Sequence, residues 1–283
     1  MALDDESFGL LRQSVQRFIQ ERLMPAENIL EEEDDVPADI VADMKEMGLF
    51  GISIPEEHGG IGLSMAQECE VVYDLGHTAF AFRSVFGTNV GIGSQGILMD
   101  GTDAQKADYL PRIASGELII SFALTEPNAG SDAASLQTRA TLDGDHYVIN
   151  GTKRFITNAP RAGAFTLMAR TGGEGAGGIS AFIVPTDTPG FHVGRPEHKL
   201  GIRASDTCPI TLEDCAVPEE NLLGERGEGL KIALSNLEGG RIGIAAQAVG
   251  IARAAFDAAR NYANERIQFG KALREHQTIA NML

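Results

Sequence analysis

A stretch at the centre of the chain, residues 121–132, combines residue types that can hold a ligand at the end of a strand. Its sequence is Ser-Phe-Ala-Leu-Thr-Glu-Pro-Asn-Ala-Gly-Ser-Asp. Phe122 and Leu124 alternate with small or polar residues, which predicts a short β-strand. Taken alone, these two apolar side chains are also consistent with an ordinary protein core.

The strand pattern ends at Glu126 and Pro127, because proline has no N–H to donate to a strand ladder. The segment 128–130, Asn-Ala-Gly, then predicts a tight turn, since Asn and Gly tolerate left-handed backbone. A loop of this kind can present free N–H groups, together with the hydroxyls of Thr125 and Ser131, to a ligand. We interpret Glu126 as a residue of the turn.

Length and composition describe a globular chain of more than one domain. Its 283 residues are enough for a large core. The formal net charge of −17 argues against a nucleic-acid partner, which needs clustered Lys and Arg. We interpret the acidity as a contribution to solubility. No apolar run approaches the roughly 20 residues that cross a bilayer, so we expect no membrane span.

The cysteines and histidines are not grouped as metal ligands. Cys69, Cys208 and Cys215 are scattered, without a Cys-x-x-Cys pair or a His cluster. We therefore expect neither a metal site nor a disulfide framework, and we interpret Cys208 and Cys215 as packed thiols. The acidic N-terminal residues resemble neither a secretory signal nor a transit peptide, which favours a cytoplasmic location.

Hydrophobic patterns divide the chain into three parts and predict an α+β multidomain fold. Helical spacing of apolar residues, which starts with a stripe over residues 5–24 that includes Val15 and Phe18, predicts an N-terminal helical domain over residues 1–118. Short strands predict a central antiparallel β-barrel or sandwich over residues 119–220, with hairpin turns at Asp143-Gly144 and Asn150-Gly151. A long apolar helical pattern predicts the start of a C-terminal helical bundle over residues 221–283.

Four glycines interrupt an apolar, helical segment at residues 80–99; they are Gly87, Gly91, Gly93 and Gly96. A glycine inside a helix costs about 1 kcal/mol relative to alanine, so each of them needs a reason. They let two helices pack closely, or they leave space for an apolar ligand beside the backbone. The sequence leaves both interpretations open.

The order of these parts resembles the flavin-dependent acyl-CoA dehydrogenases, with residues 121–132 at the centre of the resemblance. The other segments that look like family segments are Pro55–Gly62, Gln105–Pro111, Asn150–Asn158, Leu200–Thr207, Gly240–Gly250 and Arg266–Lys271. Each segment alone is a weak signal. Together, in family order, they extend the resemblance over residues of about 5–283.

The resemblance implies a homotetramer with FAD between the β-domain and the helices. Within one subunit, the positions that match flavin-binding residues, from the pyrimidine edge to the phosphate, are Phe122, Leu124, Thr125, Gly130 and Ser131. Phe155 matches the aromatic residue that covers the ring, and Thr157 matches the residue near flavin N5. Arg266, Gln268 and Phe269 match positions that reach the FAD of a neighbouring subunit. An apolar wall with donors along one edge is also what a flavin ring needs physically.

The resemblance further implies an acyl-CoA substrate. In the family, a glutamate removes the α-proton while the β-hydrogen leaves as hydride to flavin N5. Arg241 matches a position near the CoA part of the thioester, and Ser131 is a second candidate for substrate contact. A helix-surface arginine can equally pair with one of the many acids. Electrons are expected to pass to an electron-transfer flavoprotein.

No residue of this sequence matches the family's catalytic base. In most members the base lies in a segment beyond the match to Leu283, and in a minority it immediately precedes the arginine, where this chain has Gly240. Glu238 is about 200° around the helix from that position. We therefore expect the base outside these residues, in a longer chain. The alternative is a shortened protein that cannot complete the reaction.

Two other function classes share this pattern. One is a non-catalytic flavoprotein or acyl-CoA-binding subunit that lacks the base, and the other is a related flavin oxidase or monooxygenase. Reduction of the flavin by acyl-CoA, and its reoxidation by oxygen, distinguish the three. The acyl chain length is not determined, although the run 240–246 looks most like short-chain members.

Overall fold

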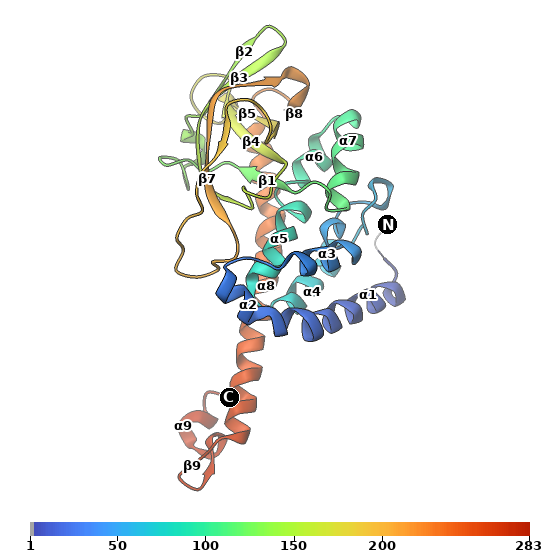
Figure 1. Ribbon diagram of the computed structural model, residues 1–283, viewed down its shortest axis with the longest axis vertical. Coiled ribbons are helices and arrows are strands. Elements are labelled where there is room, and N and C mark those ends of the chain that lie inside the picture. Colours follow the sequence, from blue (N-terminus) through green and yellow to red (C-terminus); the bar gives the residue numbers. More distant parts are fainter. Residues whose placement is uncertain (1–2) are drawn as a thin grey trace.

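The computed structural model describes residues 3–283 as a helical part, a β-sheet and a long final helix (Figure 1). The helices of the first part are α1 (Asp5–Phe18), α2 (Glu27–Glu33), α3 (Ala38–Glu46), α4 (Met65–Leu75), α5 (Phe80–Val90), α6 (Gln95–Asp100) and α7 (Asp103–Ala114). Side-chain caps set where several of them begin. Asp4 caps α1, and capping boxes at Ser64 and Thr102 begin α4 and α7.

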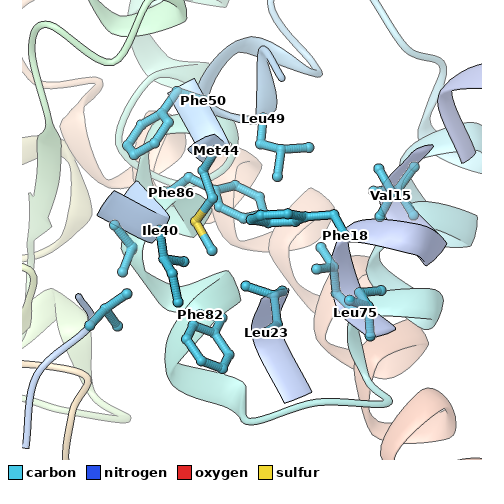
Figure 2. Close-up of a cluster of buried hydrophobic side chains, with 14 of the residues drawn as sticks. Val15, Phe18, Leu23, Ile40, Met44, Leu49, Phe50, Leu75, Phe82 and Phe86 are labelled. Carbon is cyan, nitrogen blue, oxygen red and sulfur yellow. The ribbon is translucent and has the colours of Figure 1, made fainter. Parts of the chain in front are cut away.

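A cluster of buried apolar side chains holds these helices together (Figure 2). The residues labelled there are Val15, Phe18, Leu23, Ile40, Met44, Leu49, Phe50, Leu75, Phe82 and Phe86. The apolar stripe of the first helix supplies Val15 and Phe18, as its spacing predicts. Phe82 and Phe86 place α5 in the same cluster, which fixes the helix that lies next to the sheet.

The central part is one sheet of eight strands with the order β6-β7-β3-β2-β4-β5-β8, to which β1 adds beside β4. The strands are β1 (Ile120–Ala123), β2 (Arg139–Asp143), β3 (His146–Thr157), β4 (Ala164–Arg170), β5 (Ile179–Pro185), β6 (Phe191–Val193), β7 (Thr207–Pro218) and β8 (Leu222–Leu223). Most neighbours are antiparallel, as predicted. The two exceptions are β1 and β2, which both run parallel to β4, with Ser121 opposite Phe165 and Arg139 opposite Arg170.

Of the two predicted hairpin turns, one is confirmed and one is wrong. Asp143-Gly144 joins β2 to β3. Asn150-Gly151 instead lies inside β3, at a shift of its register with β7. The Asn150 side chain bonds Asp214 on β7 twice, at 3.0 and 2.9 Å. A side chain on Gly151 would begin 2.4 Å from the Thr138 hydroxyl, so a close approach of two chain segments, and not a turn, requires this glycine.

Asn89, a fully buried side chain on α5, fixes where β1 begins. Its amide nitrogen donates to the carbonyls of Ile113 and Leu118, at 3.2 and 3.0 Å. Its amide oxygen accepts from the N–H of Ile120 at 2.9 Å. One side chain therefore joins α5, the end of α7 and the first residue of β1.

The chain ends in α8 (Gly229–Glu265), the short strands β9 (Ile267–Gln268) and β10 (Lys271–Ala272), and α9 (Gln277–Ala280). The second half of α8 and the β9–β10 hairpin extend beyond the other elements (Figure 1). α8 crosses α4 closely at Gly76 and Gly250, where a Cβ on Gly250 would lie 2.2 Å from the Tyr73 carbonyl oxygen. These two glycines therefore allow the helices to touch.

One helix of the described residues, α8, is long and apolar enough to cross a membrane by length and composition only. This helix has 37 residues and a mean hydropathy of 1.3 in its most apolar window, of which 17% is buried. Its first part packs against β5, and α4 lies along it. Its exposed apolar residues are Leu234, Ile242, Ile244, Val249 and Ile251.

Replacement of Gly250 tests the close crossing of α4 and α8. In Gly250→Ala, the new methyl group would overlap backbone atoms, so we expect the free energy of unfolding to fall by about 1–3 kcal/mol. Gly239→Ala is the matched control, because its Cβ would meet only the end of the Met65 side chain at 3.7 Å. The control should raise stability by up to about 1 kcal/mol. Equal stability changes in urea unfolding of the two FAD-saturated variants would contradict this account.

Candidate active site

The loop after β1 is a closed turn, as the sequence predicts. The N–H of Glu126 donates to the Ala129 carbonyl at 2.9 Å, and the N–H of Ala129 donates back to the Glu126 carbonyl at 3.2 Å. Pro127 and Asn128 form the exposed tip. The segment that carries the predicted ligand contacts therefore has a defined shape.

A buried ion pair fixes this loop to the sheet. Lys153 on β3 is 0% exposed, and its Nζ lies 2.7 Å from Oε1 of Glu126. The same Nζ donates to the Leu124 carbonyl at 3.1 Å. The Glu126 carboxylate also accepts from the N–H groups of Gln137 and Thr138, at 2.6 and 2.9 Å. Glu126 is therefore a turn residue, as interpreted, but also a buried anion that joins three chain segments.

The charges of this pair depend on each other. Burial lowers the pKa of Lys153 to about 8, opposed by the charge of Glu126 and its hydrogen bond. Burial also raises the pKa of Glu126, but the Lys153 charge and the hydrogen bonds outweigh this effect and leave that pKa below its ordinary value. Removing either partner would leave the other as an unpaired buried charge, which is strongly unfavourable.

The residues just before the turn are held through their backbone, which leaves their side chains available. Lys153 holds the carbonyl of Leu124, and the N–H of Arg154 donates to the carbonyl of Thr125 at 2.8 Å. Leu124 and Phe122 pack against the apolar cluster between the helices and the sheet. Within residues 3–283, the Thr125 hydroxyl has no hydrogen-bond partner in the protein.

Beyond the turn, Gly130 and Ser131 are exposed. Across the described part of the chain, their N–H groups donate no hydrogen bond to the protein. A Cβ on Gly130 would meet no atom within 4 Å, so the space beside it is open. Two adjacent free N–H groups next to open space suit an anionic group such as a phosphate.

β3 presents Phe155 from a bulge. The pairing of β3 with β7 shifts register between Lys153 and Ile156, and Phe155 has a φ of +60°. A bulky residue in left-handed backbone is an outlier that costs on the order of 1–3 kcal/mol and typically occurs at functional sites. Here it turns the ring outward, 56% exposed, while Lys153 points inward. The Arg154 guanidinium lies 5.0 Å from the ring centroid.

The end of β3 is tied to both β1 and α5. The Ser121 hydroxyl donates to the Thr157 carbonyl. The Asn158 amide nitrogen, one residue later, donates to the carbonyls of Ser84 and Val85, at 2.8 and 3.2 Å. Thr157 is therefore placed between the first residues of β1 and the middle of α5.

The structure brings most of the predicted cofactor residues together and separates three of them. Those that lie together on β1, its loop and the end of β3 are Phe122, Leu124, Thr125, Gly130, Ser131, Phe155 and Thr157. Arg266, Gln268 and Phe269 lie on the β9–β10 hairpin, at the far end of α8 (Figure 1). Arg241 lies on exposed α8 and pairs with Glu238 at 3.5 Å, which agrees with the surface-pair alternative.

Sequence reasoning missed the buried lysine and the bulge. Lys153 occupies an inward-facing position of a strand, where the alternating pattern would favour an apolar residue. A lysine at an inward-facing strand position could have indicated a buried charge, but the sequence did not identify Glu126 as its partner. The left-handed backbone of Phe155 had no sequence signal, because aromatic residues rarely adopt it.

The arrangement fits the cofactor that the sequence predicts. An isoalloxazine ring needs an apolar wall and polar groups along one edge, and a diphosphate needs N–H donors. The exposed ring of Phe155 and the packed Leu124 supply the wall. The unbonded Thr125 hydroxyl and the free N–H groups of Gly130 and Ser131 supply the donors.

Comparison with protein families agrees with this site. Residues 5–117 match the acyl-CoA dehydrogenase N-terminal domain, residues 121–215 the middle domain and residues 227–283 the C-terminal domain. The short-chain specific acyl-CoA dehydrogenase of Clostridium acetobutylicum is 42% identical over 97% of this chain and 73% of its own length. The chain thus spans about three quarters of that relative.

Two solved structures are similar over the whole chain. A structure described as an electron transferring flavoprotein of Acidaminococcus fermentans superposes with a TM-score of 0.94 and 40% identity, over 100% of this chain and 75% of the other. An acyl-CoA dehydrogenase complexed with FAD from Bacillus anthracis superposes with a TM-score of 0.90 and 37% identity, over 100% of this chain and 49% of the other. The three family matches and the identity to these relatives show that the chain belongs to the FAD-dependent acyl-CoA dehydrogenases, oxidoreductases that dehydrogenate acyl-CoA thioesters.

Proposed function

We propose that the flavin binds along β1 and its loop, with Phe122, Leu124 and Thr125 at the pyrimidine edge and Gly130 and Ser131 near the phosphate. The observation that carries this proposal is the buried Lys153–Glu126 pair. It holds the Leu124 carbonyl and the turn. The Thr125 hydroxyl and the N–H groups of Gly130 and Ser131 form no bond to the described protein and can therefore bind a flavin. Ser131 is also proposed to contact the substrate.

Phe155 and Thr157 complete the proposed flavin site on β3. The exposed Phe155 ring would cover the flavin and exclude water. Thr157 would lie near flavin N5, held there by the bonds of Ser121 and Asn158 on either side. Bound FAD supplies the hydride acceptor for the β-hydrogen of the acyl group.

Arg241 is proposed to contact the CoA part of the substrate. It is exposed, and its partner Glu238 is exposed too, so this ion pair is weak and easily exchanged for a CoA phosphate. Glu238 pairs with Arg241. Gly240, at the position where a minority of the family has the base, carries no carboxylate. We assign no catalytic base among the described residues.

We propose a homotetramer in which Arg266, Gln268 and Phe269 reach the FAD of a neighbouring subunit. Two features support it. The hairpin that carries these residues extends away from the chain's own flavin loop (Figure 1). The exposed apolar residues of α8 form a surface that association would bury.

Three further proposals concern the electron acceptor, the cellular location and the domain boundaries. We propose an electron-transfer flavoprotein as the electron acceptor, in line with the description of one structural neighbour. A cytoplasmic location is supported by free cysteines, of which Cys208 and Cys215 are buried thiols. We also propose domain boundaries near residues 118 and 220; the first follows the end of α7, and the second lies just before β8, which pairs with β5 of the central sheet.

Anaerobic mixing with acyl-CoA tests the reaction directly. We expect a short-chain acyl-CoA to bleach the yellow flavin, because the hydride reduces it. Binding without bleaching would instead favour a non-catalytic flavoprotein. Rapid reoxidation of the bleached protein by oxygen would favour an oxidase or monooxygenase. Absorbance spectroscopy in a sealed cuvette measures all three outcomes.

Replacement of Lys153 tests the role of the buried pair. Lys153→Met leaves Glu126 buried without its cation, so we expect the free energy of unfolding to fall by about 3–5 kcal/mol. FAD affinity should fall at least about tenfold, because the Leu124 carbonyl loses its donor.

The control is Lys231→Met, which removes an exposed lysine that pairs with Glu228 and should cost less than about 1 kcal/mol. If Lys153→Met does not fold, the double variant Lys153→Met with Glu126→Gln removes both charges and should recover part of the stability. Wild-type FAD affinity in either variant of Lys153 would refute the role.

Phe269→Ala tests the contact between subunits. Phe269 is 95% exposed in one chain, so its loss should leave subunit stability unchanged. We expect FAD affinity to fall about tenfold if the ring covers the cofactor of a neighbour. Leu10→Ala, another exposed apolar residue, is the control. Unchanged FAD content, with an unchanged mass by light scattering, would remove Phe269 from the site.

A further inference from the structure

The bulge in β3 places two neighbouring side chains on the same side of the sheet. In a regular strand, the side chains of adjacent residues point to opposite faces. Here the side chains of Arg154 and Phe155 are both exposed, at 46% and 56%, because the left-handed backbone of Phe155 turns its ring outward. The two side chains therefore meet, and the Arg154 guanidinium lies over the Phe155 ring, 5.0 Å from its centroid.

A carboxylate holds the guanidinium in this place. Nε of Arg154 donates to Oε1 of Glu197 at 3.3 Å. The N–H of Glu197 donates to the Thr207 carbonyl at 2.8 Å, which fixes Glu197 beside the first residue of β7. Thr207 in turn lies opposite Thr157, on the far side of the bulge. The ion pair therefore connects the residue before the bulge to the strand that lies opposite the residues after it.

This bracing acts on the strained part of the proposed flavin wall. A bulky residue with a φ of +60° is stable only where the surrounding structure holds it. The backbone is held on one side by the N–H of Arg154, which donates to the Thr125 carbonyl at 2.8 Å. The exposed Phe155 ring can still rotate about its side-chain bonds. A cation over one face restricts this rotation, because it is attracted to the negative face of the ring.

The guanidinium also determines which surface of the ring stays open. One face of Phe155 lies against Arg154, so a second planar group can pack against the other face. Among residues 3–283, the Phe155 ring pairs with no other aromatic ring. An isoalloxazine ring is a planar group of the kind that this open face fits.

On the basis of the proposed placement of the flavin beside Phe155, we infer that Arg154 is a positioning residue that acts through this ring. Together with Glu197, Arg154 holds the ring in the orientation that packs against the flavin. In this role the guanidinium contacts the ring and not the flavin. The wall is then ordered before the cofactor binds, which reduces the entropy lost on binding and keeps water from the site of hydride transfer.

Removal of the guanidinium tests this role. Arg154→Met keeps an unbranched side chain and the N–H that bonds Thr125, but it removes the cation and the bond to Glu197. We expect the apoprotein to bind FAD about two- to fivefold more weakly in calorimetry, because an exposed cation–π contact contributes on this scale. Anaerobic reduction of the flavin at saturating acyl-CoA should slow by a similar factor, with an unchanged dissociation constant for the acyl-CoA.

A double-mutant cycle with Phe155→Ala assigns the effect to the ring. If Arg154 acts through Phe155, Arg154→Met should weaken FAD binding in the wild-type background and cause no further loss in the Phe155→Ala background. A loss of equal size in both backgrounds, or no loss in either, would overturn the inference. The pair of Arg154 and Glu197 would then be an ordinary exposed ion pair, which contributes little.

The matched control is Arg112→Met on α7. Arg112 is 42% exposed and its Nε donates to Glu117 at 3.1 Å, but among the described residues it lies over no aromatic ring. Its loss should leave FAD affinity and the rate of flavin reduction unchanged. If Arg154→Met does not fold, Glu197→Gln is the second test, because it releases the guanidinium without removing it. It too should weaken FAD binding only where Phe155 is present.

Phe155→Ala alone tests the proposed flavin placement. Wild-type FAD affinity in this variant would contradict that placement, and the role of Arg154 with it. Weaker binding in Phe155→Ala, combined with an additive or absent effect of Arg154→Met, would overturn the role of Arg154 alone. Weaker binding in both single variants, without further loss in the double variant, is the result that both proposals predict.

Discussion

The buried ion pair between Lys153 and Glu126 is the interaction on which the site depends. It lies 2.7 Å apart in a place where neither charge reaches water, so each needs the other. Glu126 also holds two N–H groups at the start of β2, and Lys153 holds the last carbonyl before the turn. The loop, β2 and β3 therefore keep one geometry before any ligand binds, which is the preorganisation that tight and specific binding requires.

Lys153 and Phe155 lie two positions apart on the same strand, and their side chains face opposite ways. Lys153 points into the protein, and the bulge that follows turns Phe155 outward in left-handed backbone. In a regular strand, residues two positions apart point to the same face, so the Phe155 ring would point inward like Lys153. The cost of the bulge is offset by the surrounding bonds, in which Arg154 holds Thr125 and Asn158 holds α5. The strained bulge leaves the Phe155 ring exposed, and the ion pair holds the loop on which the N–H groups of Gly130 and Ser131 form no hydrogen bond to the described protein.

The sequence predicted the parts whose signals are local. The helical stripe with Val15 and Phe18, the turn at Glu126 and the hairpin at Asp143-Gly144 follow from short-range patterns, and the structure contains all three. It did not predict features set by contacts between distant segments. Asn150-Gly151 has the composition of a turn, but its bonds to Asp214 and the approach of Thr138 keep it within a strand. Lys153 was missed for the same reason, since burial depends on neighbours far along the chain.

The central claim is that this preorganised loop and the Phe155 bulge hold the flavin, and a structure of the FAD complex tests it most directly. The account predicts the isoalloxazine against Phe155, its pyrimidine edge at Leu124 and Thr125, and a phosphate at the N–H groups of Gly130 and Ser131. It also predicts the Lys153–Glu126 bond unchanged by binding. A flavin bound elsewhere, or a loop that must open this ion pair to accept the cofactor, would contradict the account.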